Sequence, residues 1–159
     1  MARNVCTDAG PLRFIETISI GPHVLQADEP SPSGGADAGP DPLELVLAAL
    51  GSCASITIRM YADRKQWPLQ GVHVCLSYAT KHAEGYGESD ATVGMGQLIE
   101  MEISVTGDLS DDQRRRLLEI ANRCPVHRML ESQVQIRARL RDPEYTGQNN
   151  PAVPPTTGR

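Results

Sequence analysis

The fold depends on residues 42–65, which read PLELVLAALGSCASITIRMYADRK. After Glu44 the chain runs 14 residues without a charged side chain. Asp41 is a favourable N-cap residue and a proline follows it, so the pattern predicts a helix from Pro42 to Arg64 or Lys65. The uncharged run is shorter than the roughly 20 residues of a membrane span. Because the helix is apolar almost all round, we expect it to be covered on most sides within a core.

Two strands are predicted before this helix. Residues 12–20, LRFIETISI, and residues 23–28, HVLQAD, flank a Gly-Pro pair that favours a turn. Residues 29–42 contain four prolines and three glycines, which predicts a loop.

Two further strands and two helices are predicted after it. Residues 72–81 alternate so that apolar side chains share one face, residues 84–96 form a glycine-rich loop, and residues 98–106 form the next strand. A helix begins at Asp108 or Ser110, where the sequence resembles a capping box. The apolar face of the strand at residues 72–81 consists of Val72, Val74, Leu76 and Tyr78. The apolar stripe of the predicted helix consists of Leu117, Leu118, Ile120 and Ala121.

The chain then predicts a short helix from Cys124 to about Glu131 and a closing strand at residues 134–140, VQIRARL. The order is therefore ββα, then ββαα, then β. Strands grouped in this way with intervening helices indicate an α+β fold rather than a doubly wound sheet.

Composition limits the function classes. The chain has 159 residues, enough for one domain over residues 1–141, followed by a loosely ordered, proline-rich tail at 142–159. The net charge of −5 argues against nucleic acid or an anionic membrane as the main partner. Four cysteines are too few for a disulfide-stapled secreted domain, and residues 1–10 lack an apolar signal core. We expect a cytoplasmic protein with reduced thiols.

Cys124 occupies a position that can activate a thiol. It directly precedes Pro125, so it is predicted to cap a helix N-terminus, where partial positive charge lowers a thiol pKa. His127, three residues later on the same helix face, could pair with a thiolate, although a structural role is an equal alternative. Cys124 and His127 would supply two metal ligands, whereas a structural zinc site needs four.

Cys53 lies in the middle of the central helix and has two interpretations. A buried free cysteine is often a small apolar side chain without chemistry. Alternatively, it is the second sulfur of a dithiol that cycles through a disulfide with Cys124. The other cysteines have no supporting pattern: Cys75 is interpreted as strand packing, and Cys6 lies in an end expected to fray.

Three segments carry a resemblance to a known family. Residues 34–53, GGADAGPDPLELVLAALGSC, then 59–69, RMYADRKQWPL, and then 117–130, LLEIANRCPVHRML, resemble the OsmC/Ohr family of osmotically induced and organic hydroperoxide resistance proteins. The resemblance runs from about Ala27 to Leu140. It implies two central helices packed with antiparallel sheet, in an intertwined homodimer with sites at the subunit interface.

The resemblance also implies site residues. Cys53 matches the cysteine that peroxide attacks, and Cys124 matches the resolving cysteine, whereas the helix-terminus argument favours Cys124 as the more acidic thiol. In the hydroperoxide resistance branch a glutamate directly follows the proline of this segment, where this chain has Leu43. Glu44 comes one position later and lies half-way round the helix from Cys53, so it either supports the site from another subunit or stabilises the helix N-terminus. Arg13, Arg59 and Arg128 are candidate cations to which no motif assigns a role.

The predicted activity is a thiol-dependent peroxidase that reduces organic hydroperoxides through a Cys53/Cys124 sulfenic acid–disulfide cycle. The family implies a dithiol reductant, in one branch a lipoylated protein, and no metal, flavin or haem. Two alternatives remain: a thiol–disulfide reaction on a substrate other than a peroxide, and a dimeric ligand-binding module with inert thiols.

Overall fold

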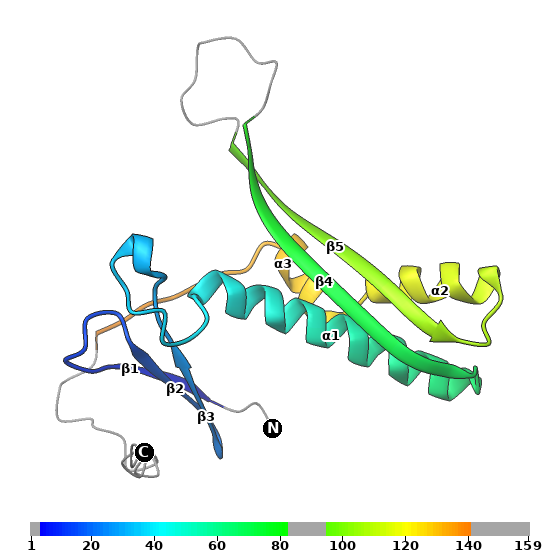
Figure 1. The fold of residues 1–159 in the computed structure, drawn as a ribbon, viewed down its shortest axis with the longest axis horizontal. Helices are drawn as coiled ribbons and strands as arrows, with labels where there is room; N and C mark the ends of the chain where they lie inside the picture. Colours follow the sequence, from blue (N-terminus) through cyan, green and yellow to red (C-terminus); the bar gives the residue numbers. More distant parts are fainter. Residues whose placement is uncertain (1–3, 83–94, 141–159) are drawn as a thin grey trace. The chain divides into compact units, whose positions relative to one another are not determined.

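The computed structural model describes residues 4–82 and 95–140 (Figure 1). Residues 84–94 of the predicted loop and the predicted tail at 142–159 lie outside the described residues. The described chain forms two compact units, one made of residues 4–45 and 135–140 and the other of residues 46–134.

The first unit contains a three-stranded antiparallel sheet. Its strands are β1 (Val5–Ala9), β2 (Glu16–Ile20) and β3 (His23–Ala27), in the order β1-β2-β3. The sequence did not predict β1, which fell in the end expected to fray. The predicted strand at residues 12–20 begins only at Glu16, because the residues before it form a turn. In that turn the Ile15 N–H donates to the Leu12 carbonyl at 2.9 Å.

A buried carboxylate holds the loop that follows β3, which includes the 3-10 helix η1 (Ser31–Ser33). Asp28 is 2% exposed, and its oxygens accept the backbone N–H groups of Glu29 at 2.8 Å, Ala36 at 2.8 Å and Ala38 at 3.1 Å. Burial pushes the pKa of Asp28 up, but these three donors outweigh it and lower the pKa below its ordinary value. A Cβ on Gly35 would lie 1.8 Å from the Glu29 carbonyl oxygen, so the loop closes only around a glycine.

Helix α1 (Pro42–Lys65) confirms the predicted bounds and the predicted cap. The Asp41 carboxylate accepts the Glu44 N–H at 2.8 Å, and the Glu44 carboxylate accepts the Asp41 N–H at 2.9 Å. This reciprocal pair is a capping box, with Asp41 in the place that serine or threonine usually takes.

The second unit combines most of α1 with a hairpin and two short helices. Strands β4 (Leu69–His82) and β5 (Met95–Gly107) pair antiparallel, and α2 (Asp111–Ala121) and α3 (Pro125–Glu131) follow (Figure 1). By length and composition alone, α1 could cross a membrane. Its buried residues instead lie in the core of this unit. That core consists of Leu50, Ala54, Ile58, Ala62, Leu69, Leu109, Leu117, Ala121 and Cys124.

The hairpin packs one face against the core, as the alternation of residues 72–81 predicts. Val72 and Leu76 are partly buried against the core cluster, whereas His73 and Cys75 between them are exposed. Gly51 of α1 permits the close approach, since a Cβ there would lie 2.7 Å from the Leu76 Cδ1 atom. The hairpin therefore has one packed face and one exposed face.

Helix α2 begins at a complete capping box. The Ser110 hydroxyl accepts the Gln113 N–H at 3.3 Å, and the Gln113 side chain accepts the Ser110 N–H at 2.9 Å. The sequence offered Asp108 or Ser110 as the start, and the structure assigns Ser110 as the cap.

We expect Ser110→Ala to lower the free energy of unfolding by about 1 kcal/mol, because an N-terminal N–H loses its acceptor. Urea unfolding followed by circular dichroism measures this change. Ser110→Asn is the matched control, since asparagine caps as well as serine does. An equal loss in both variants would show that the cap is not the cause.

The predicted closing strand at residues 134–140 is wrong. Residues 133–140 have no regular secondary structure, and Ile136 and Leu140 are 89% and 102% exposed. Alternating apolar residues make a segment suitable for a strand, but a strand also needs a neighbour to satisfy its backbone groups. None of the described strands pairs with this segment.

Candidate active site: a paired cysteine centre

Two predicted site residues meet in the core of the second unit. Cys124 is fully buried, and Cys53, on α1, packs half-buried against the cluster that contains Cys124. Both thiols are free, and Cys53 is close enough for its side chain to perturb the ionisation of Cys124. The sequence predicted that these two sulfurs are neighbours, and in the structure both residues belong to or pack against the same core cluster.

Cys124 caps helix α3, as the sequence predicted. Its backbone is extended, with φ −65° and ψ 150°, and Pro125 opens the helix. The Cys124 Sγ accepts the backbone N–H of His127 at 3.4 Å. The sulfur therefore takes the role that a hydroxyl or carboxylate oxygen plays at an ordinary N-cap.

The predicted acidity of Cys124 is nevertheless wrong. Burial is the largest influence and raises the pKa of the Cys124 thiol, and the neighbouring Cys53 raises it further. The backbone N–H of His127 lowers it, but by less, so the pKa stays above its ordinary value. The helix N-terminus does interact with Cys124 Sγ, but placing a thiolate in an apolar core costs more than this interaction returns.

We expect Cys53→Ala to lower the pKa of Cys124 without restoring its ordinary value, because burial remains. A pH titration of the Cys124 resonance in 13C-cysteine-labelled protein measures this shift, with the urea-unfolded chain as reference. An unchanged or raised midpoint in Cys53→Ala would contradict the influence of Cys53 on the Cys124 pKa.

The raised pKa also predicts the direction of a stability change. A raised pKa in the folded state contributes stability below the unfolded thiol pKa of about 8.5, and this stability is lost as pH rises through the folded value. The free energy of unfolding should therefore fall above about pH 8.5 more steeply in the native chain than in Cys124→Ser, which cannot ionise there.

His127 contributes its backbone to the site. Its imidazole Nδ1 lies 3.3 Å from the Glu131 carboxylate one helical turn later, without hydrogen-bond geometry, and the side chain is 24% exposed. In the described structure His127 contacts Cys124 through its backbone N–H. A role for the imidazole in tuning the thiol stays a prediction.

Three of the remaining candidate residues have a structural role within their own element or with its neighbour. The described bonds of Glu44 are those of the α1 capping box, in the first unit. Arg59 donates to the Leu69 carbonyl at 2.8 Å and to the Gln70 carbonyl at 3.1 Å, so it ties α1 to the start of β4. Arg128 lies in the last turn of α3, where a cation suits the helix dipole.

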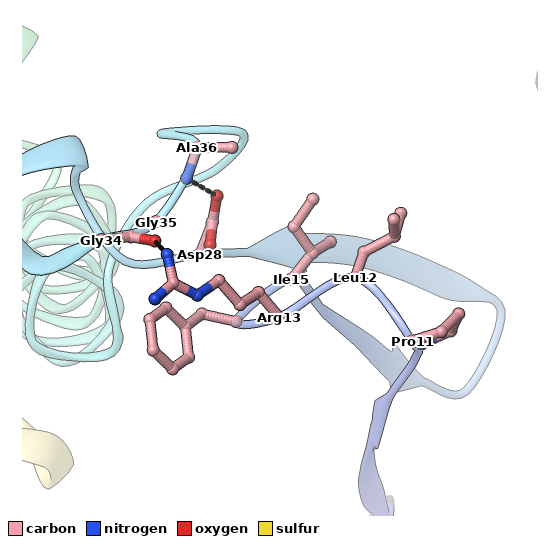
Figure 2. A pocket seen from close by; sticks show the side chains of 9 residues that line it. Pro11, Leu12, Arg13, Ile15, Asp28, Gly34, Gly35 and Ala36 are labelled. Carbon is pink, nitrogen blue, oxygen red and sulfur yellow. Dashed lines mark hydrogen bonds between the residues drawn. The ribbon is translucent and has the colours of Figure 1, made fainter.

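Arg13 lies at a pocket of about 500 Å³ that the sequence did not predict (Figure 2). It adopts a left-handed conformation, with φ 43°, and its guanidinium donates to the Gly34 carbonyl at 2.8 Å. The guanidinium carbon also lies 5.3 Å from the centre of the Phe14 ring. The lining residues are Pro11, Leu12, Arg13, Phe14, Ile15, Asp28, Gly34, Gly35 and Ala36.

The signal for this pocket was present in the sequence as Asp28 followed by Gly34-Gly35. A buried aspartate can anchor a loop through several backbone N–H groups, and a glycine allows the loop to close on itself. What the sequence could not show is that the loop returns to the turn containing Arg13. Within residues 4–82 and 95–140, no three His, Cys, Asp or Glu side chains are grouped so that they could hold a metal ion.

Comparisons with known proteins place the chain in a family. A family model described as OsmC-like protein matches residues 34–139. A search of curated proteins finds no match.

Solved structures share the fold at low sequence identity. An organic hydroperoxide resistance protein OsmC from Legionella pneumophila, also described as a predicted redox protein, is 17% identical with a TM-score of 0.61, covering 82% of this chain and 89% of its own. A putative osmotic stress induced and detoxification response protein from Psychrobacter arcticus is 17% identical with a TM-score of 0.62, covering 81% and 87%.

A third similar structure is a putative organic hydroperoxide resistance protein from Vibrio cholerae, with captopril bound in one of its active sites. It is 18% identical with a TM-score of 0.56, covering 80% of this chain and 83% of its own. These likenesses support the mixed helix and antiparallel-sheet fold. Since the family model spans well over half of the chain, the protein belongs to the OsmC-like protein family.

Proposed function

We propose that this protein is a thiol peroxidase that reduces organic hydroperoxides. The observation that carries the proposal is that Cys53 packs against the core cluster containing Cys124, near enough to raise the pKa of that thiol. Membership of the OsmC-like family, and similar structures described as organic hydroperoxide resistance proteins, support the choice of substrate.

The proposed cycle uses both sulfurs. The Cys53 thiolate attacks the terminal oxygen of ROOH, the O–O bond breaks, and ROH leaves after taking up a proton. Cys53 becomes a sulfenic acid, oxidised by two electrons. The Cys124 thiol then attacks that sulfur, water leaves, and a disulfide forms. A dithiol reductant returns two electrons and two protons, which restores both thiols.

The difference in burial supports this order of attack. Cys53 is partly exposed and Cys124 is fully buried, so Cys53 is the sulfur that a peroxide can reach. Burial and Cys53 keep the pKa of Cys124 raised, and Cys124 therefore remains a protonated thiol during the first step. Oxidation of Cys53 removes one of the two influences that hold the Cys124 pKa up.

A homodimer completes the proposal. Several large apolar side chains on α1 are exposed in the single chain, and they are Leu43 at 43%, Val46 at 41%, Ile56 at 58% and Met60 at 67%. Exposed apolar surface on this scale suits an interface between subunits. Glu44 from a second subunit could then support a Cys53 thiolate. The proposed reductant class is a protein-bound dithiol such as a lipoyl group.

One experiment separates the function classes. The reduced protein receives one equivalent of cumene hydroperoxide or of H₂O₂, and intact-mass and peptide mass spectrometry follow thiol loss. The proposal expects a Cys53–Cys124 disulfide, formed faster with cumene hydroperoxide. Loss of the Cys53 or Cys124 thiol to a disulfide reagent, with no loss of either to the two peroxides, supports a thiol–disulfide activity. Inertness of both of these thiols to all three reagents supports a binding module.

A further inference from the structure

The exposed face of the hairpin carries a second thiol with a basic partner. Cys75 Sγ lies 3.2 Å from His73 Nε2, and both side chains are exposed. Residues two apart on a strand share a face, so the regular geometry of β4 holds the pair together. The sequence interpretation of Cys75 as strand packing is wrong, because Cys75 is exposed and the face that packs is that of Val72 and Leu76.

The neighbours of this pair on β5 are polar and acidic. Ser104 lies opposite His73, and Glu102 lies opposite Cys75. Glu100, opposite Ser77, is the next residue along the same face. Opposed residues in an antiparallel pair have Cβ atoms roughly 5 Å apart, so Glu102 is within reach of the dyad. The carboxylates attract cationic reagents.

The other cysteines lack this combination. Cys124 is buried with a raised pKa, and Cys53 belongs to the core site. Cys6, on β1, is exposed like Cys75 and lies opposite Ser19. In the described part of the chain no basic side chain bonds to Cys6. Cys6 is therefore an internal control for exposure alone.

We propose that Cys75 and His73 form a surface thiolation site that reacts with low-molecular-weight disulfides. His73 Nε2 takes the proton of the Cys75 thiol, and the resulting thiolate attacks one sulfur of RS–SR. A Cys75–SR bond forms, the S–S bond breaks, and RS⁻ leaves and takes up the proton from the imidazolium. Cys75 is oxidised and one half of the reagent is reduced. This reaction is independent of the peroxide cycle.

The test uses the full-length reduced protein and less than one equivalent of cystamine, a disulfide with two ammonium groups. The reaction is quenched with acid and peptide mass spectrometry measures the occupancy of each cysteine over time. We expect Cys75 to react at least about fivefold faster than Cys6 at pH 7, because only Cys75 has a base within reach. His73→Gln should bring the rate of Cys75 close to that of Cys6 and leave Cys6 unchanged.

Each outcome is informative. Equal rates at Cys75 and Cys6 in the native chain, or a Cys75 rate that His73→Gln does not change, would overturn the proposal. A lower rate at both cysteines in His73→Gln indicates a global change and also counts against it. Glu102→Gln should slow cystamine more than it slows oxidised glutathione, which is anionic, because it removes the carboxylate opposite Cys75.

Discussion

Cys53→Ser should reduce the rate of cumene hydroperoxide consumption by at least about a thousandfold, since removal of a catalytic nucleophile removes the covalent step. Cys124→Ser should retain the first attack and lose the disulfide, which leaves Cys53 as a sulfenic acid. A coupled assay with a dithiol reductant measures turnover, and dimedone labelling with peptide mass spectrometry locates the sulfenic acid. Cys6→Ser is the matched control, because Cys6 is exposed on β1 and belongs to the first unit, whereas Cys53 and Cys124 belong to the second.

The label decides between two assignments. Label on Cys53 in Cys124→Ser, with none on Cys124 in Cys53→Ser, fits the burial of the two sulfurs. The reverse pattern would reassign first attack to Cys124 and would require the core around it to open. Undiminished consumption by both single variants would overturn the proposed cycle, because the reaction would then not depend on Cys53 or Cys124.

The sequence predicted those features that depend on neighbouring residues. Asp41 before Pro42 predicted the start of α1, and the capping pattern at Ser110 predicted the start of α2. Both predictions are possible from sequence because each cap bonds to a residue three positions later. The same locality explains the correct N-cap position of Cys124.

Features that depend on the tertiary fold could not be predicted from neighbouring residues in the sequence. The pKa of Cys124 is raised by burial, which no local pattern records. Residues 134–140 alternate like a strand, but whether they form one depends on a neighbour. The pocket at Arg13 depends on a loop that is anchored by Asp28 and returns to the turn containing Arg13.

The second large effect concerns the core that holds Cys124. Leu117 is 1% exposed and belongs to the same buried cluster as Cys124, whereas its neighbour Leu118 on α2 is 50% exposed. We expect Leu117→Ala to lower the free energy of unfolding by about 2–5 kcal/mol, because it removes buried methyl groups and leaves a cavity. Leu118→Ala, the same chemical change one residue later, should cost less than about 1 kcal/mol. Urea unfolding at one fixed protein concentration measures both.

The same pair of variants tests whether the core controls the site. A buried thiol reacts with iodoacetamide only when the structure around it opens, and the free energy of opening sets the rate. Leu117→Ala should therefore raise the alkylation rate of Cys124 by at least about tenfold, while Leu118→Ala leaves it nearly unchanged. If both variants alkylate Cys124 at the native rate despite the loss of stability, the opening that exposes this sulfur does not involve α2. Access to Cys124 would then be controlled by the short helix α3 that it caps.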